Sequence, residues 1–195
     1  MCVAVSGSRR TAVVLAALLS AFVAACWGTI AAVGAFPADG ATAREVAEQR
    51  LGDLGLALPR ALAFLGSPPV AAAWTAALAL VIARWLGRRY GALILAAAGV
   101  FLITTLIKVL ADRPRPAGGA GLDPSFPSGH TAYVTAVLGL TAILLAERRR
   151  RGLAAGALLV VAAMGPSRVV LGVHWLSDVL AGYAIGAAWL ALVVA

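Results

Sequence analysis

The sequence predicts an all-α integral membrane protein in which a single domain, residues 1–195, forms a bundle of six transmembrane helices. Two observations predict this class. First, the chain is 62% hydrophobic and only 12% charged, whereas soluble domains average about 45–50% apolar and about 25% charged residues. Second, six segments lack any Asp, Glu, Lys or Arg side chain, and about 20 apolar residues are enough to span a bilayer. The mean hydropathy of +0.95 agrees with this class.

The uncharged segments give the expected order of the spans. They cover residues 11–36, 61–83, 90–107, 124–146, 152–167 and 179–195. The first three are long enough by themselves, and the last three become long enough when the polar motif beside each is included. Ala, Gly, Val and Leu dominate the chain, and small residues allow helices to pack closely in lipid.

The positive charge of the chain, a formal net charge of +8, is concentrated between alternate spans. Arginines stand at positions 9 and 10, at 84, 88 and 89, and at 148–151. Alternate connections lie on one side of a membrane, and the positive-inside rule makes that side cytoplasmic. We therefore interpret the arginines as determinants of topology that also attract anionic lipid headgroups, and not as a nucleic-acid site. Both termini are expected in the cytoplasm, and the membrane is expected to be the plasma (inner) membrane.

The amino-terminal segment allows a second interpretation. Arg9 and Arg10, an apolar run and then Val-Ala-Ala-Cys26 are compatible with a cleaved signal and a lipid-modified cysteine. A retained first helix is the simpler prediction, because the apolar run continues past Cys26 to Phe36. Cys2 and Cys26 are too few for a disulfide framework.

Two longer connections are predicted on the opposite, extracytoplasmic face. Residues 38–60 mix charged residues with apolar ones at the spacing of a short amphipathic helix that lies on the membrane surface. Such a helix would serve as a connector resting on lipid or, alternatively, would shape substrate access. Residues 111–127 are rich in Pro and Gly and form a predicted active-site loop. The third helix must end near residues 108–111, since Pro114 and Pro116 cannot continue it, and the fourth begins near Pro127.

The chain has only two histidines and a single lysine, and each lies in a polar cluster beside an apolar segment. Charged groups at membrane depth cost about 2.5–3.5 kcal/mol each on insertion scales, so these clusters indicate a site. In the cluster Ser128-Gly129-His130, the start of a helix offers unpaired N–H groups that bind anions such as phosphate. Gly129 lets a ligand approach the backbone, and His130 can transfer a proton. An ordinary helix start capped by Ser128 is the alternative.

The second cluster contains Lys108 and Arg115. A guanidinium pairs with phosphate through two hydrogen bonds and an ammonium acts as a point charge, and Arg115 is restricted by Pro114 and Pro116 on either side. Two alternatives remain open. Lys108 is near the end of its helix, from which its side chain could reach water, and Arg113 and Arg115 could be surface charges of a polar loop.

The third cluster contains His174 and Asp178, which are four residues apart and would share a helix face. Asp178 would accept a hydrogen bond from Nδ1 of His174 and leave Nε2 free as a nucleophile. A buried His–Asp pair that only packs helices is the alternative. Arg168 is the one formal charge between Arg151 and Asp178, and it needs an anionic partner, either Asp178 or a ligand.

Together the clusters resemble the type 2 phosphatidic acid phosphatase (PAP2) superfamily, which also includes vanadium haloperoxidases and bacterial acid phosphatases. The motifs of that family are K-x6-RP, PSGH and SR-x5-H-x3-D. In this chain they read Lys108 with Arg115-Pro116, Pro127-Ser128-Gly129-His130, and Ser167-Arg168 with His174 and Asp178. All spacings match. The resemblance covers roughly residues 60–195 and implies the six-helix arrangement of the lipid phosphatase branch.

The resemblance also implies a role for each motif residue. His174 would attack phosphorus and carry a phospho-histidine, Asp178 would orient His174, and His130 would protonate the leaving oxygen and then activate water. The phosphate would be held by Lys108, Arg115, Ser128, Gly129 and Arg168.

The implied activity is hydrolysis of a membrane lipid phosphate or diphosphate on the extracytoplasmic face, without metal or cofactor. Substrates of the polyprenyl diphosphate, phosphatidylglycerol phosphate, phosphatidic acid and prenyl-phosphosugar phosphate types are all compatible, with polyprenyl diphosphate weakly favoured. Asp112 and Asp123 form no clear carboxylate cluster that would predict magnesium. The alternatives are a lipid phosphotransferase with the same site, a vanadate-dependent haloperoxidase and a non-enzymatic lipid-binding membrane protein. The sequence leaves the oligomeric state open.

Overall fold

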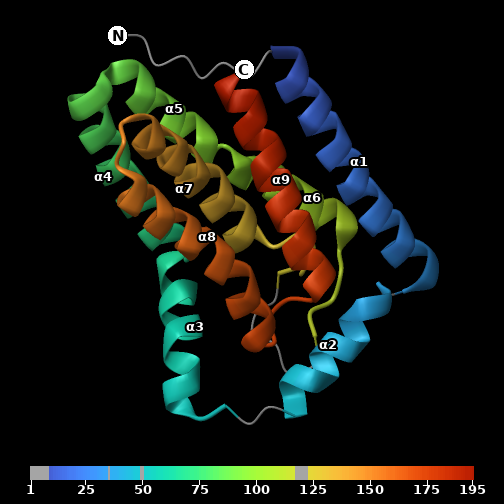
Figure 1. Cartoon of the computed structure of the whole chain (residues 1–195). Coiled ribbons are helices and arrows are strands. Elements are labelled where there is room, and N and C mark those ends of the chain that lie inside the picture. The colour runs from blue at the N-terminus through green and yellow to red at the C-terminus, as the bar shows by residue number, and fades with distance from the viewer. Residues whose placement is uncertain (1–8, 35, 49–50, 117–122) are drawn as a thin grey trace.

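The computed structural model describes residues 9–34, 36–48, 51–116 and 123–195, and the regular structure of these residues is helical. The helices are α1 (Arg9–Val33), α2 (Pro37–Glu48), α3 (Asp53–Leu65), α4 (Pro68–Leu86), α5 (Arg88–Ala98), α6 (Val100–Ala111), α7 (Gly129–Glu147), α8 (Arg151–Val170) and α9 (Leu176–Val194). Figure 1 shows the long helices gathered into one bundle, with α2 and α3 at one end. The start of α1 and the C-terminus lie at the other end.

Six stretches of helix among the described residues are long and apolar enough to cross a membrane. They are α1, α4, α5 together with α6, α7, α8 and α9, which confirms the predicted six-helix class. The second span begins at Pro68 and not near residue 61, because Gly66 ends α3 and the pair Pro68-Pro69 opens α4. Proline suits the first turn of a helix, where its missing N–H has no partner to lose.

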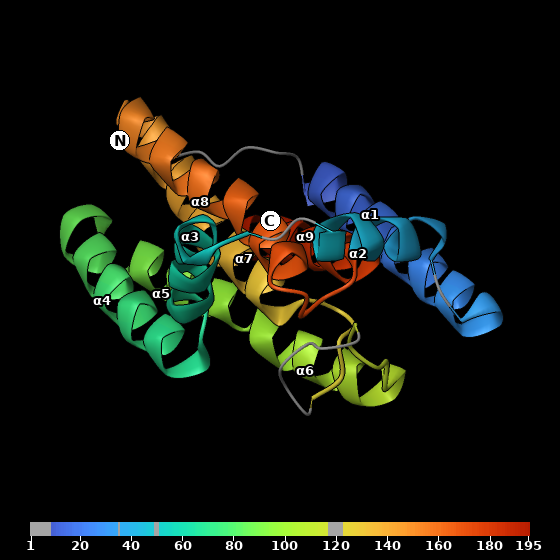
Figure 2. The same cartoon turned by 90° about the horizontal axis from the view of Figure 1, so that it is seen from below.

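The connection between the first two spans contains two helices, α2 and α3, where the sequence predicted one short amphipathic helix over residues 38–60. Seen from that end (Figure 2), α2 lies by the start of α9 and α3 by α8, and contacts join both pairs. On α3, Leu54 and Leu58 are exposed, as expected for a helix at a membrane surface. On α2, by contrast, Asp39 is buried with 1% of its surface exposed, so tertiary contacts hold this helix in place.

The centre of the bundle is α7, which packs against both α8 and α9. The contact between α7 and α9 is close because α9 carries Gly182 and Gly186 four residues apart on the facing side. A Cβ at Gly182 would lie 2.7 Å from the carbonyl oxygen of Ser128, and one at Gly186 would lie 2.6 Å from that of Ala132. Small residues at this spacing let two backbones approach in a membrane.

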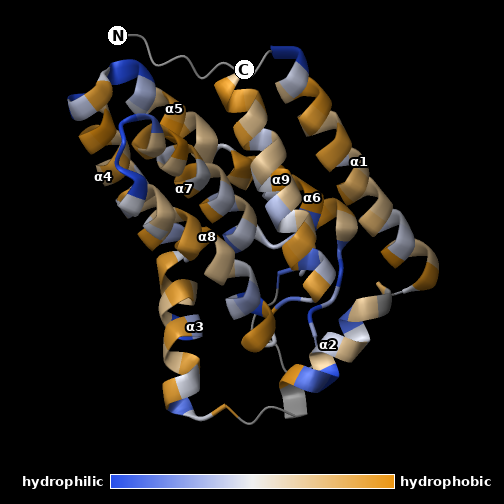
Figure 3. Cartoon of the chain, viewed as in Figure 1, coloured by the Kyte–Doolittle hydropathy of each residue, from blue (hydrophilic) through white to orange (hydrophobic). Residues whose placement is uncertain are grey.

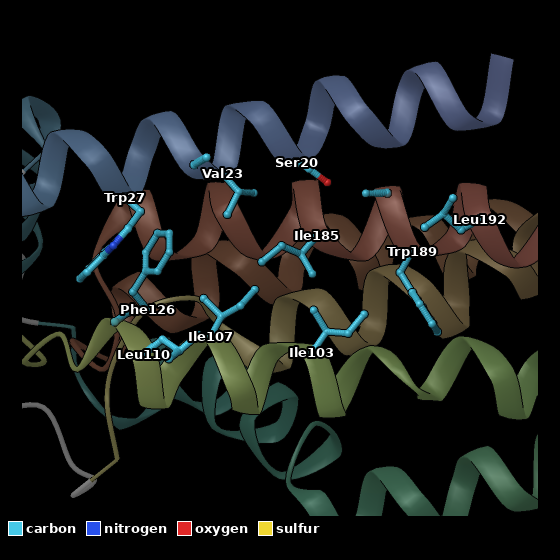
Figure 4. Close-up of a pocket in the computed structure, with 13 residues that line it drawn as sticks. Ser20, Val23, Trp27, Ile103, Ile107, Leu110, Phe126, Ile185, Trp189 and Leu192 are labelled. Atoms are coloured by element: carbon cyan, nitrogen blue, oxygen red, sulfur yellow. The ribbon is translucent and has the colours of Figure 1, made fainter. Parts of the chain in front are cut away.

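The outer helix α1 packs mainly on α9. An apolar groove of about 380 Å³ lies between α1, α6 and α9, and Figure 4 shows the side chains that line it. At one end of the groove the rings of Trp27 and Phe126 are 5.6 Å apart. Phe126 is fully buried and lies just before the start of α7, so α1 helps to fix the segment that leads into the second motif.

The polar residues separate to the two ends of the bundle, as the hydropathy colouring of Figure 3 shows. The arginines at 84, 88, 89 and 148–151 lie in or beside the turns between α4 and α5 and between α7 and α8, and both turns lie at the end where α1 begins. The three polar motifs lie at the opposite end, with α2 and α3. The helix ends beside the first two motifs agree with the prediction: α6 ends at Ala111, and α7 begins at Gly129, two residues after Pro127.

The close contact of α7 and α9 predicts the effect of adding one methyl group. Gly186→Ala should destabilise the fold by about 1–3 kcal/mol, because the backbone of α7 must move to admit the Cβ. The thermal unfolding midpoint in detergent measures this loss. The matched control is Gly156→Ala on α8, where nothing lies within 4 Å of the added Cβ. Equal midpoints for the two variants would contradict the described packing.

Candidate functional site

Residues from all three motifs line one cavity of about 780 Å³ at the end of the bundle that carries α2 and α3. Its wall includes six of the predicted site residues, namely Lys108, Arg115, Gly129, His130, Arg168 and His174. They come from α6, the loop after it, α7, α8 and the turn before α9. The two other predicted residues, Ser128 and Asp178, are fully buried behind this wall.

His174 and Asp178 are in contact, but not through the helix face that the sequence suggested. His174 precedes α9, and Asp178 is in its first turn. Nδ1 of His174 lies 3.3 Å from Oδ2 of Asp178, and the same oxygen accepts the backbone N–H of Trp175 at 2.9 Å. The carboxylate of Asp178 thus caps the start of α9 and orients the imidazole through Nδ1. Nε2 is therefore the ring nitrogen that remains available to react.

Burial lowers the pKa of the His174 imidazole, since 4% of its side chain is exposed. The hydrogen bond and the charge of Asp178 raise that pKa, and the charges of Lys108 and Arg115 lower it. The pKa of His174 remains below its ordinary value. The imidazole is therefore neutral at neutral pH, and a lone pair is available on the ring.

His130 lies in the first turn of α7 and contacts α3. Its Nε2 lies 3.3 Å from the carbonyl oxygen of Ala63, which is in the last turn of α3. That carbonyl lacks a helical partner, because the N–H of Ser67 goes to Phe64 instead. A carbonyl only accepts, so Nε2 carries the proton in this contact. The close approach also depends on Gly66, where a Cβ would lie 2.4 Å from the imidazole.

Arg168 is buried, with 3% of its surface exposed. Its Nη2 donates to the carbonyl oxygen of Pro59 and its Nε to the hydroxyl of Ser167, each at 3.1 Å. None of the ion pairs found in the described part of the chain includes Arg168. Asp178 is therefore excluded as the partner of Arg168. The guanidinium of Arg168 faces the cavity and pairs with no carboxylate of the described residues.

Lys108 and Arg115 share one carboxylate, that of Asp123. The distances from this carboxylate are 3.1 Å to Nζ of Lys108 and 2.8 Å to Nη2 of Arg115. Lys108 also donates to the carbonyl of Pro124, and Arg115 donates to that of Val173 at 2.6 Å. Partial burial opposes ionisation of Asp123, but hydrogen bonds and charge from the two cations outweigh it and lower the pKa of its carboxyl. Asp123 therefore stays anionic and offsets part of the positive charge of Lys108 and Arg115.

At the start of α7, Gly129 lines the cavity, whereas the hydroxyl of Ser128 does not. The Ser128 hydroxyl lies 3.0 Å from that of Thr131, and its N–H donates to the carbonyl of Asp178. The structure thus turns the Ser128 side chain away from the cavity, because the residue packs against Gly182 of α9. Gly129 is in the wall of the cavity, so the partially positive end of α7 faces it.

The sequence allowed Arg113 to be a surface charge of a polar loop, and this interpretation is wrong. Its side chain is 5% exposed and its guanidinium lies between Asp39 and Asp178. Nη2 is 2.7 Å from Oδ2 of Asp39, and Nη1 is 2.5 Å from Oδ1 of Asp178. Sequence reasoning missed both Arg113 and Asp39, since 74 residues separate them and no local pattern pairs them. Among the described residues, no group of three His, Cys, Asp or Glu side chains is placed to hold a metal ion.

Comparison with known proteins gives a consistent result. Residues 89–195 match the model of the PAP2 superfamily. The fold is similar to the transmembrane PAP2 type phosphatidylglycerolphosphate phosphatase of Bacillus subtilis, with a TM-score of 0.81 and 23% identity over 91% of this chain and 93% of that one. It is also similar to LpxE of Aquifex aeolicus, with a TM-score of 0.63 and 20% identity over 80% of this chain and 94% of that one.

Two curated relatives match shorter regions. Decaprenylphosphoryl-5-phosphoribose phosphatase of Mycobacterium tuberculosis is 41% identical over 120 residues, which are 56% of this chain and 64% of the relative. Non-specific acid phosphatase of Salmonella typhi is 40% identical over 83 residues, 38% of this chain and 28% of the relative. The chain thus spans less than two thirds of the length of these curated relatives.

The shared carboxylate of Asp123 predicts how the cavity responds to a free anion. Asp123→Asn should bind orthovanadate about fivefold more tightly, because the anion no longer competes with a carboxylate for Lys108 and Arg115, a partly exposed contact worth up to about 1 kcal/mol. Titration calorimetry of the protein in detergent measures the affinity. The control is Asp112→Asn, the same change at an exposed residue of the same loop. Unchanged or weaker binding by Asp123→Asn would show that the carboxylate does not compete.

Proposed function

The chain belongs to the PAP2 superfamily, and on that premise we propose that it is a metal-independent membrane lipid phosphatase acting through a phospho-histidine intermediate. The observation that carries the proposal is the single cavity in which His174 and His130 meet three cationic side chains, those of Lys108, Arg115 and Arg168. A nucleophile, a proton donor and a set of phosphate ligands are the groups that phosphoryl transfer requires.

The first step forms the intermediate. Nε2 of His174 attacks phosphorus, and a P–N bond forms as the bond from phosphorus to the leaving oxygen breaks. His130 enters this step as the imidazolium, gives one proton to that oxygen and becomes neutral, so the lipid leaves as a neutral alcohol or, from a diphosphate, as a monophosphate. Asp178 holds Nδ1–H of His174 and stabilises the positive charge that develops on the ring.

The second step returns the enzyme to its starting state. The neutral His130 takes a proton from water and returns to the imidazolium, and the oxygen of that water attacks phosphorus. The P–N bond breaks, inorganic phosphate leaves, and its two bonding electrons return to Nε2 of His174. Throughout, Lys108, Arg115, Arg168 and the start of α7 neutralise the phosphoryl oxygens, which is the main catalytic demand of this reaction. These cations supply the charge that a metal ion supplies in other phosphoryl-transfer enzymes.

The rest of the cavity fits a lipid. Away from the cations, its wall contains Ala71 and Ala72 of α4 and Phe101 and Val109 of α6. Phe101 and Val109 are 46% and 70% exposed on the flank of the bundle, where a bilayer would surround these apolar helices. A phosphate bound to the cations would thus leave its lipid tail between α4 and α6. We assign the substrate to the lipid phosphates and diphosphates of polyprenyl, phosphatidylglycerol phosphate or phosphatidic acid type.

The positions of the charges support an orientation. The arginine-rich turns lie at the end of the bundle opposite the cavity, and arginine-rich turns face the cytoplasm. The active site accordingly faces the extracytoplasmic side of the plasma (inner) membrane, with both termini in the cytoplasm.

The decisive variant for the activity is His174→Ala. Wild-type protein in detergent should release phosphate from a panel of lipid phosphates and diphosphates in the presence of EDTA. His174→Ala should lose at least about 10³-fold in rate, because the covalent route is removed. Trp85→Ala, which removes an exposed ring near the end of α4, is the control. Release at the wild-type rate by His174→Ala would refute the mechanism, and transfer of phosphate to an added alcohol would identify a phosphotransferase.

The lowered pKa of His174 predicts the acid limb of the pH profile. Protonation removes the lone pair that attacks phosphorus, so activity falls as the pH drops through the pKa of His174. Because that pKa lies below the ordinary value of 6.5, the midpoint of the limb should lie below pH 6.5. The measurement is kcat/KM against pH, corrected for titration of the substrate. A corrected midpoint at or above 6.5 would contradict the described environment of His174.

A further inference from the structure

We infer that Asp39 and Arg113 are positioning residues that hold Asp178, and through it His174, in the reactive geometry. The four residues Asp39, Arg113, Ser177 and Asp178 are referred to below as the clasp. The inference rests on the proposed function, because His174 matters as a nucleophile only in that reaction. It goes further by giving α2 and the loop after α6 a part in setting the site.

Arg113 joins two buried carboxylates through its planar fork. Nη1 donates to Oδ1 of Asp178 and, at 2.8 Å, to the hydroxyl of Ser177, and Nη2 donates to Oδ2 of Asp39. Its guanidinium also lies 5.4 Å from the centre of the Trp175 ring. A lysine in its place could not reach both carboxylates in this geometry, since one ammonium replaces a rigid fork.

Both carboxylate oxygens of Asp178 therefore have hydrogen-bond partners in the protein. Oδ1 is taken by Arg113, and Oδ2 is shared by the N–H of Trp175 and Nδ1 of His174. The carboxylate is 0% exposed, so water cannot replace a lost partner. Without Arg113, Oδ1 would be a buried charge without a partner, and the carboxylate would turn toward another donor. The imidazole of His174 would lose its fixed orientation as a result.

Within the clasp, Asp39 binds Ser177 through both oxygens of its carboxylate. Its Oδ1 accepts the backbone N–H of Ser177 at 2.9 Å, and its Oδ2 accepts the hydroxyl of Ser177 at 2.6 Å. Ser177 is in the first turn of α9, where N–H groups lack helical partners. A carboxylate from α2 therefore acts as the cap of α9 and also neutralises Arg113. It ties α2 to the turn that carries His174.

A positioning role differs from a simple structural brace in what it changes. Neither Asp39 nor Arg113 lines the cavity, so their loss should leave substrate binding nearly intact. If they position the nucleophile, kcat falls and KM changes little. If these residues only stabilised the fold, their loss would lower the thermal stability and the amount of active protein. His174 in the folded fraction would then keep its geometry.

The variants are Arg113→Met, Arg113→Lys, Asp39→Ala and Asp39→Asn. The two conservative changes preserve size or charge and guard against loss of folding. The matched controls are Arg60→Met and Asp53→Asn, which break an exposed ion pair of 2.9 Å on α3. Phosphate release from the lipid panel gives kcat and KM for each variant. We expect kcat to fall about a hundredfold in Arg113→Met, as for a reacting group displaced by about 1 Å, less in the conservative variants, and not at all in the controls.

A second readout does not depend on activity. The chain has only two histidines, so protein labelled with ¹⁵N-histidine gives the imidazole signals of His130 and His174 alone, and a His130→Gln variant assigns them. In the wild-type protein His174 should be fixed as the Nδ1–H tautomer. In Arg113→Met and Asp39→Ala its signals should shift toward a mixture of tautomers, and in the controls they should not.

Each result decides the question. A lower kcat with unchanged KM and a mixed tautomer of His174 would establish the positioning role. A fixed Nδ1–H tautomer in Arg113→Met and Asp39→Ala would overturn it, whatever the activity. If wild-type protein released no phosphate from any lipid while the tautomer still responded, the proposed function would fail and the clasp would stand.

Discussion

The structure depends on one buried carboxylate, that of Asp178. It lies in the first turn of α9 and accepts hydrogen bonds from His174, from the backbone of Trp175 and from Arg113. Its own backbone carbonyl accepts the N–H of Ser128, just before α7. One residue thus joins the second and third motifs, and Arg113 connects it to the loop of the first. A charge with no access to water must have all its partners supplied by the protein, and here those partners come from separate segments of the chain.

This requirement explains why the residues of the three motifs lie together at one end of an apolar bundle. Among the described residues, the cations that face the cavity have few acids near them: Lys108 and Arg115 share Asp123, and Arg168 has two oxygen acceptors but no carboxylate. An excess of positive charge in a half-buried cavity favours an anion with several oxygens. The neutral imidazole of His174 is compatible with that environment, because burial and the charges of Lys108 and Arg115 both disfavour its protonation.

The sequence predicted the six spans because hydrophobic periods are local properties, and motif spacing singled out eight residues, six of which the structure places around one cavity. It predicted the contact of His174 with Asp178 but attributed it to a shared helix face, whereas the contact arises because Asp178 closes the start of α9. It did not predict the side-chain position of Ser128, which depends on packing against Gly182 of another helix. Arg113 with Asp39, and the contacts of α3 with His130 and Arg168, are tertiary contacts between distant segments, for which a single sequence carries no signal.

The central claim is that His174 forms a covalent bond to phosphorus, and trapping that bond tests it most directly. Protein mixed with a ³²P-labelled lipid phosphate and quenched within one turnover should contain label that is stable to alkali and lost in acid, as for a phosphoramidate. Peptide mapping should place the label on His174. Label on another residue, or none in a wild-type protein that is turning over substrate, would contradict the account.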